Sequence, residues 1–186
     1  YDDYTAKVNE ALAHRSIQVT GIHTFQNKEE AIRNASAILV GGGNTFHLLK
    51  MLQELKLDSL IQKAVLNGTP YVGWSAGSNI TSPTICTTND MPIVEPVSFN
   101  ALSLVPYQIN AHYTELTLLN HGGESRKQRL FEYLAANPKQ RVVCLPESSY
   151  LLVKDENHTY IGSTDGRDMT QHSSREIKSH AELTIN

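Results

Sequence analysis

Residues 71–77, Tyr-Val-Gly-Trp-Ser-Ala-Gly, decide the fold of this chain. Tyr71-Val72 has the apolar, β-type character of a buried strand, and Ser78-Asn79 follows as a helix start. Between them the sequence fits Gly-x-Ser-x-Gly, in which the glycines allow a turn that is too tight for Cβ atoms. Such a turn lifts the serine hydroxyl out of the fold. The segment therefore predicts an exposed nucleophile, Ser75, on the sheet of an α/β protein.

A second glycine-rich turn lies upstream of this segment. Ala37-Ile38-Leu39-Val40 predicts a buried strand, Gly41-Gly42-Gly43-Asn44 ends it, and residues 45–57 predict an amphipathic helix. The turn lacks the Gly-Lys-Ser/Thr ending of a P-loop and the spacing of a dinucleotide-binding fingerprint. If the strands before the two turns end at the same edge of one sheet, the amides of residues 41–44 would form an oxyanion site next to Ser75. A plain structural turn is the alternative interpretation.

The rest of the chain alternates helices and strands. Helices are predicted over 4–12, 27–35, 60–66 and 124–136, strands over 16–20 and 142–145, and a β-hairpin over 150–153 and 159–162. Residues 82–105 indicate loop with brief strands, and the polar residues after Thr164 are weakly patterned. This order predicts a single α/β domain over 1–186, with a mostly parallel sheet sandwiched by helices.

Composition excludes several functional classes. The net charge of −3 leaves no excess of cations for nucleic acid or an anionic lipid surface. No apolar run approaches the roughly 18 residues of a membrane span. Cys86 and Cys144 are too few for a disulfide scaffold or a cysteine-built zinc site, which favours a reducing cytoplasm. Both cysteines are interpreted as core residues.

A nucleophilic serine needs a base, and the base needs an orienting acid. His112 is the best candidate among the eight histidines, because it ends the strand-like segment 105–112 and the carboxyl ends of parallel strands gather ligands. Asp90, in the loop after the elbow, and Glu147, after the strand ending at Leu145, are the two candidate acids. The short separation of Ser75 and His112 excludes a complete α/β-hydrolase fold.

Taken together, these motifs resemble the aspartyl dipeptidase family, also called peptidase E, over nearly the whole chain. The most specific stretches are residues 38–46, 71–79 and 87–94, with further matches at 108–113, 123–126 and 145–147. The resemblance implies an α/β fold related to class I glutamine amidotransferases, whose elbow carries cysteine instead of serine. The family's opening strand has no counterpart here, so we expect the domain to lack its N-terminal strand. The tail after Gly162 follows the family poorly.

The resemblance also implies roles for individual residues. These are Ser75 as nucleophile, His112 as base, the backbone amides of Gly43 and Ala76 as the oxyanion hole, and Arg126 as the ligand of the substrate carboxylate. Asp90 and Glu147 both match positions that have been assigned to the orienting acid. We prefer Asp90, because its shorter side chain loses less rotamer entropy when it is held in place.

The implied reaction is serine-type hydrolysis of α-Asp-X dipeptides in the cytoplasm, through an acyl-enzyme and without a metal or organic cofactor. Its partners would be short peptides with an N-terminal aspartate, with no nucleic acid and no membrane, and homodimerisation is left open. One alternative is a cyanophycinase-like or isoaspartyl serine peptidase, which shares a similar elbow and fold. Another is a non-enzymatic small-molecule binding domain on the same scaffold.

Overall fold

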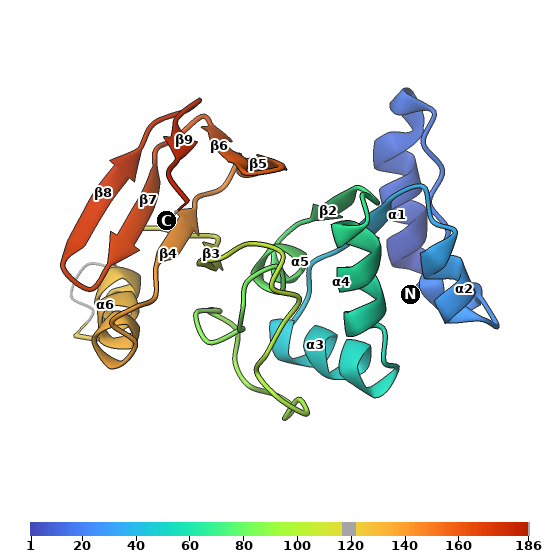
Figure 1. Cartoon of the computed structure of the whole chain (residues 1–186), viewed down its shortest axis with the longest axis horizontal. Helices are drawn as coiled ribbons and strands as arrows, with labels where there is room; N and C mark the ends of the chain where they lie inside the picture. Colours follow the sequence, from blue (N-terminus) through green and yellow to red (C-terminus); the bar gives the residue numbers. More distant parts are fainter. Residues whose placement is uncertain (117–121, 186) are drawn as a thin grey trace.

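The computed structural model describes residues 1–116 and 122–185 (Figure 1). Its α-helices are α1 (Asp2–Leu12), α2 (Lys28–Arg33), α3 (Thr45–Glu54), α4 (Asp58–Leu66), α5 (Ala76–Asn79) and α6 (Arg126–Ala136), with short 3-10 helices at Ala13–Arg15 and Ile22–Thr24. Its strands are β1 (Ile38–Val40), β2 (Tyr71–Gly73), β3 (Gln108–Ala111), β4 (Val142–Leu145), β5 (Ser149–Lys154), β6 (Asn157–Gly162), β7 (Gly166–Thr170), β8 (Ser173–Ile177) and β9 (Glu182–Leu183). The predicted α/β class is confirmed.

The N-terminal half is built on a parallel pair of strands. β1 and β2 align so that Val40 lies opposite Gly73, and the next amide, that of Trp74, donates to the Val40 carbonyl over 3.2 Å. α3 and α4 contribute buried leucine and isoleucine side chains to the core beside this pair. The register ends both strands at the same edge, so the two glycine-containing turns begin side by side.

The C-terminal half is a mixed sheet with the order β3-β4-β7-β8. β3 and β4 are parallel, whereas β7 and β8 are antiparallel to their neighbours. Side chains of β4 alternate between two cores: Val142 packs with Leu130 of α6, and Val143 packs with Tyr160 of the second sheet, β5-β6-β9. β4 is therefore buried on both faces, as its unbroken apolar run predicts.

The end of the chain forms more strands than its sequence indicates. The hairpin of β5 and β6 is confirmed, and residues 82–105 form loop with one isolated bridge, as expected. β7, β8 and β9 were not predicted, because their outward positions are polar and only scattered residues such as Met169, Ile177 and Leu183 face a core. These strands add antiparallel pairs to the two parallel ones.

The predicted strand over 16–20 is wrong. This segment is irregular, and Ile17 remains 48% exposed. The side chain of Asn9 on α1 takes the place of a neighbouring strand: its amide group donates to the Val19 carbonyl over 2.8 Å, and its oxygen accepts from the Val19 amide over 2.6 Å. A local side-chain contact thus satisfies backbone groups that a sheet would otherwise pair.

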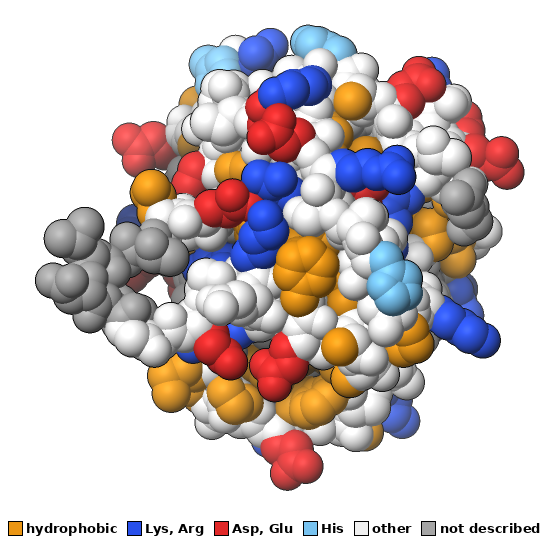
Figure 2. All heavy atoms as spheres, turned by 90° about the vertical axis from the view of Figure 1, so that its left-hand side faces the viewer, with side chains coloured by type: hydrophobic (Ala, Val, Ile, Leu, Met, Phe, Trp, Pro, Cys, Tyr) orange, Lys and Arg blue, Asp and Glu red, His pale blue; other side chains and the backbone are white. Residues whose placement is uncertain are grey.

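The side of the molecule formed by β7, β8 and α6 carries charges of both signs, interspersed rather than segregated (Figure 2). Two ion pairs involve residues of β7: Asp168 with Arg141 at 2.7 Å, and Arg167 with Glu115 at 2.9 Å. Neither sign forms a continuous field on the atoms visible there. Across the residues that the structure describes, no helix has both the length and the apolarity needed to cross a bilayer.

Candidate active site

Ser75 lies in a strained turn between β2 and α5. Its φ of 57° and ψ of −117° belong to a region that side-chain-bearing residues rarely adopt. The flanking glycines are required by space: a Cβ on Gly77 would lie 2.0 Å from the Val40 carbonyl oxygen, and one on Gly73 would lie 2.4 Å from the Gly77 carbonyl oxygen. This close packing against β1 holds the turn in its strained form and agrees with the expected elbow.

His112 connects this serine to a carboxylate. Its Nε2 lies 2.8 Å from the Ser75 Oγ, and its Nδ1 is hydrogen-bonded to Glu147. An imidazole whose Nδ1 proton is donated to the carboxylate has a free lone pair on Nε2 to accept the serine proton. The three side chains therefore form an unbroken chain from hydroxyl to carboxylate, which is the arrangement that activates a serine.

The backbone explains why these three groups meet. Ala111 lies opposite Leu145 in the parallel register of β3 and β4, so His112 and Glu147 follow neighbouring strands at the same edge. His112 adopts a left-handed conformation with φ of 55°, and its carbonyl accepts a hydrogen bond from the Arg126 guanidinium. The histidine is thus fixed through its backbone and through both ring nitrogens.

The preference for Asp90 over Glu147 is wrong as a statement of which acid contacts His112. Asp90 instead lies at the N-terminus of α3, where its Oδ2 accepts from the Thr45 amide at 2.7 Å, from the Thr45 hydroxyl at 2.5 Å and from the Thr88 hydroxyl at 3.2 Å. Strand pairing decided which acid reaches the imidazole. The difference in rotamer entropy between aspartate and glutamate is small and does not determine which carboxylate lies within reach of His112.

Asn79, which sequence reasoning did not select, links the Asp90 loop to the base. Its Nδ2 donates to the hydroxyls of Thr45 and Thr88, each over 3.2 Å, and its Oδ1 accepts from the Ala111 amide at 3.2 Å. The next loop residue, Asn89, donates to the Ala111 carbonyl over 2.9 Å. Both backbone groups of the residue before His112 are thereby held by asparagine side chains.

The glycine turn after β1 lies against Ser75. A Cβ on Gly42 would stand 3.1 Å from the Ser75 Cβ, while Gly43 is exposed with φ of 135°. Within the described part of the chain, the amides of Gly43 and Ala76 donate no hydrogen bond, whereas the Gly42 amide donates to the Tyr4 hydroxyl. The two amides expected to bind an oxyanion are therefore both unoccupied donors next to the elbow.

Arg126 opens α6 beside a polar cavity of about 270 Å³. The cavity is lined by residues 86–92, Arg126, Arg129, Leu130 and Tyr133. Partial burial lowers the pKa of the Arg126 guanidinium. Arginine side chains nevertheless remain cations in proteins. The same residue thus contacts the backbone of His112 and presents positive charge to a cavity that could hold a small acidic side chain.

Comparison with known proteins places this geometry in a family. The model of peptidase family S51 matches residues 1–161. The chain belongs to peptidase family S51. Peptidase E of Nostoc sp. is 50% identical over 163 residues, which cover 88% of this chain and 67% of that protein. Peptidase E of Shewanella denitrificans is 46% identical over 166 residues, covering 89% of this chain and 71% of that protein.

A solved structure supports the fold of this S51 member. The crystal structure of a peptidase from an acI-B1 actinobacterium superposes with a TM-score of 0.69 at 12% identity, covering 99% of this chain and 76% of that one. The family model and the relatives at 46–50% identity confirm the resemblance to the peptidase E family and assign the chain to the peptidases.

Proposed function

We propose that this S51 peptidase is a serine dipeptidase that hydrolyses peptides with an N-terminal aspartate through an acyl-enzyme. The observation that carries the proposal is the hydrogen-bonded chain of Ser75, His112 and Glu147. In this proposal Glu147, not Asp90, is the orienting acid. Short peptides with an N-terminal aspartate are the substrates, as the family resemblance implies.

Each residue of the chain has a defined task. His112 Nε2 takes the proton of the Ser75 hydroxyl as Oγ forms a bond to the carbonyl carbon that follows the aspartate. Glu147 holds the imidazole through Nδ1 and stabilises the imidazolium that results. The imidazolium then gives its proton to the departing amine, which leaves an ester on Ser75. A water gives a proton to the same nitrogen and attacks the ester carbon. The bond from that carbon to Oγ then breaks, the proton returns to Oγ, and aspartate is released.

The negative charge that develops on the carbonyl oxygen needs fixed donors. The amides of Gly43 and Ala76 donate no hydrogen bond within the described residues. They lie on the two turns that begin where the parallel pairing of β1 and β2 ends. Preorganised amides stabilise such an oxyanion without reorientation during the reaction. The amides in the first turn of α5 also carry positive partial charge, which favours an anion at this position.

Arg126 is proposed to select the aspartate side chain. A guanidinium binds a carboxylate through two parallel hydrogen bonds. Arg126 borders the polar cavity and also donates to the His112 carbonyl. Because Arg126 also bonds the His112 carbonyl, carboxylate binding and placement of the base would be coupled through one side chain.

The deciding experiment is labelling with a fluorophosphonate, combined with hydrolysis of Asp-Leu. We expect wild-type protein to be labelled at Ser75 and to release aspartate, and Ser75→Ala to do neither. Near-wild-type hydrolysis by Ser75→Ala would overturn the assignment of the nucleophile. A wild-type preference for β-linked over α-linked Asp-Leu would favour the isoaspartyl alternative, and an unlabelled, inactive wild type would favour a binding domain.

A further inference from the structure

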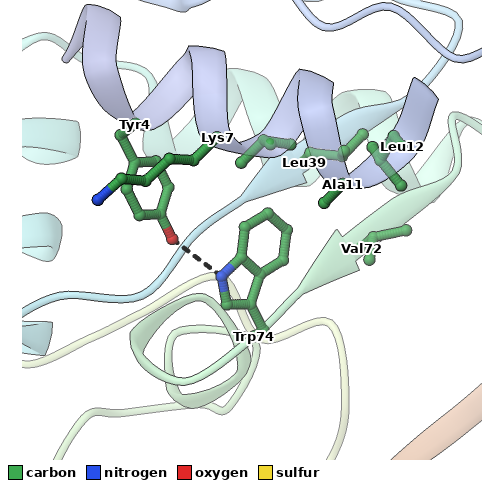
Figure 3. Close-up of a pocket in the computed structure, with 8 residues that line it drawn as sticks. Tyr4, Lys7, Ala11, Leu12, Leu39, Val72 and Trp74 are labelled. Carbon is green, nitrogen blue, oxygen red and sulfur yellow. Dashed lines mark hydrogen bonds between the residues drawn. The ribbon is translucent and has the colours of Figure 1, made fainter.

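The hydroxyl of Tyr4, on α1, lies between the glycine turn after β1 and the turn that carries Ser75. It accepts a hydrogen bond from the Trp74 indole Nε1 over 2.9 Å and another from the Gly42 amide over 3.1 Å. Trp74 immediately precedes the proposed nucleophile, and Gly42 immediately precedes Gly43. Figure 3 shows Tyr4 projecting from α1 toward the indole, with the contact drawn as a dashed line.

The ring of Tyr4 contacts the glycine turn at Gly41, although the residue is 45% exposed. A Cβ on Gly41 would lie 2.5 Å from the Tyr4 Cε1 and 2.5 Å from its Oη, so glycine is required there for the ring to approach. The tyrosine and indole rings are nearly parallel, with an interplanar angle of 17° and centroids 6.5 Å apart. Tyr4 thus packs on the backbone of one turn and faces the side chain of the other.

We propose that Tyr4 is a positioning residue that fixes the oxyanion-binding turn relative to the nucleophile. This inference rests on the proposed function. Tyr4 holds the Gly42 amide in a hydrogen bond, so that this amide does not donate to an oxyanion and Gly43 supplies the donor from its turn. By accepting from Trp74 as well, one oxygen links the turn that carries Gly43 to the turn that carries Ser75 and Ala76.

The chemistry requires such a link because the oxyanion donors come from two different segments. Both amides can bind one oxyanion only if the distance between them is right, and neither turn sets that distance alone. A displacement of a few tenths of an ångström weakens a charge-assisted hydrogen bond. The parallel pairing of β1 and β2 ends at Val40 and Gly73, before either donor. Tyr4 supplies a further bridge between the turns beyond the last strand pair.

The test is Tyr4→Phe, with Tyr1→Phe as its matched control on the same helix end. Phenylalanine keeps the ring on Gly41 and removes only the shared acceptor. The Tyr1 hydroxyl has no hydrogen bond to another described residue, and its ring contacts His23. We expect Tyr4→Phe to lower kcat for Asp-Leu by about 3- to 10-fold with KM within about two-fold of wild type, less than the loss of a direct oxyanion donor. Tyr1→Phe should match wild type.

Two measurements follow the contact independently of activity. Trp74 is the single tryptophan of the chain, so its fluorescence reports on the loss of the Tyr4 acceptor. Amide hydrogen exchange at Gly42 should become faster in Tyr4→Phe and not in Tyr1→Phe. If both signals are unchanged, the contact does not exist in solution. If they change while kcat does not, the contact is only structural and the positioning role is overturned.

The inference and the proposed function fail in different ways. A wild-type chain that hydrolyses no Asp-Leu would overturn the function, whereas an active wild type with an unimpaired Tyr4→Phe would overturn only the role of Tyr4. Should Tyr4→Phe fail to fold, Trp74→Phe removes the other side of the bridge. It must then lower kcat in the same range and leave KM in place, and normal turnover by Trp74→Phe would contradict the proposal.

Discussion

Glu147 holds His112 across the edge of two parallel strands, because Ala111 and Leu145 lie opposite each other in β3 and β4. The backbone register therefore sets the distance between base and acid. The Glu147 side chain is 77% exposed, so its interaction with the imidazole is weakened by solvent and contributes little to folding. In the proposed mechanism, Glu147 therefore acts on the reaction rather than on the stability of the protein.

Glu147→Gln should therefore separate activity from stability. We expect kcat for Asp-Leu to fall by about 10²- to 10⁴-fold, because the neutral amide no longer stabilises the imidazolium or fixes its tautomer. The free energy of unfolding in urea should change by less than about 0.5 kcal/mol, as for other exposed positions. A variant that keeps wild-type turnover would remove Glu147 from the proposed mechanism.

Asp90→Asn should affect stability first. The carboxylate accepts three hydrogen bonds at the start of α3, two of them from Thr45, and its charge is favourable at a helix N-terminus. We expect a loss of about 1–2 kcal/mol in the free energy of unfolding. Asp58→Asn, in the first turn of α4, is the control for charge alone and should change it by about 0.5 kcal/mol or less. Equal losses in both variants would show that the Asp90 hydrogen bonds add nothing.

These two acids also show the limit of prediction from the sequence. The residues of the elbow and of the first glycine turn could be located because their signals are local: an apolar strand, glycines and a helix start within about ten residues. Whether Asp90 or Glu147 meets His112 depends on the pairing of β3 with β4, which are separated by more than thirty residues along the chain. No local pattern contains that pairing.

Tyr4 was missed for the same reason. Its place among the apolar positions of α1 predicted packing, and nothing near it indicates a contact with Trp74, seventy residues away. The best sequence signal would have been Gly41, the first of three consecutive glycines, since such a run suggests that another group approaches the backbone. The strand predicted over 16–20 shows the opposite case, in which a local pattern was present but misleading. The apolar residues alternate there, but the Asn9 side chain bonds the backbone of Val19 in place of a neighbouring strand.

Arg126→Ala tests the selection of aspartate. The comparison is the ratio of kcat/KM for Asp-Leu to kcat/KM for Asn-Leu, which cancels any general loss caused by breaking the contact with the His112 carbonyl. We expect the ratio to fall by about 10-fold or more, because a charge-assisted pair is removed only for the acidic substrate. Arg129→Ala, on the next turn of the same cavity wall, is the matched control. An unchanged ratio in Arg126→Ala would exclude Arg126 from specificity.

The strain of the elbow can be measured with two inactive variants. Ser75→Ala removes the hydroxyl but keeps the Cβ that makes φ of 57° and ψ of −117° unfavourable, whereas Ser75→Gly removes both. We expect Ser75→Gly to be more stable than Ser75→Ala by about 1 kcal/mol in urea unfolding, despite the greater entropy of glycine in the unfolded chain. If alanine is the more stable of the two, the turn is not strained in solution.

His158 gives the fold a pH dependence that is separate from the catalytic site. It is 5% exposed, its Nδ1 lies 2.7 Å from the Tyr107 hydroxyl, and burial, assisted by the nearby Arg141 charge, lowers its pKa below the ordinary 6.5. The unfolded chain therefore binds a proton at a higher pH than the folded one does. The stability associated with neutral His158 is complete above pH 6.5 and is lost as the pH falls below it.

The measurement is the urea midpoint of wild type and His158→Gln at pH 7.5 and pH 5.5. Glutamine should lower stability at pH 7.5 by about 1–3 kcal/mol, because a buried hydrogen bond and packing are disturbed. The decisive quantity is the change between the two pH values. Wild type should lose more stability on acidification than His158→Gln, in which the buried titrating group is absent while all the carboxylates remain. Equal losses in the two proteins would mean that His158 does not titrate in this range on unfolding.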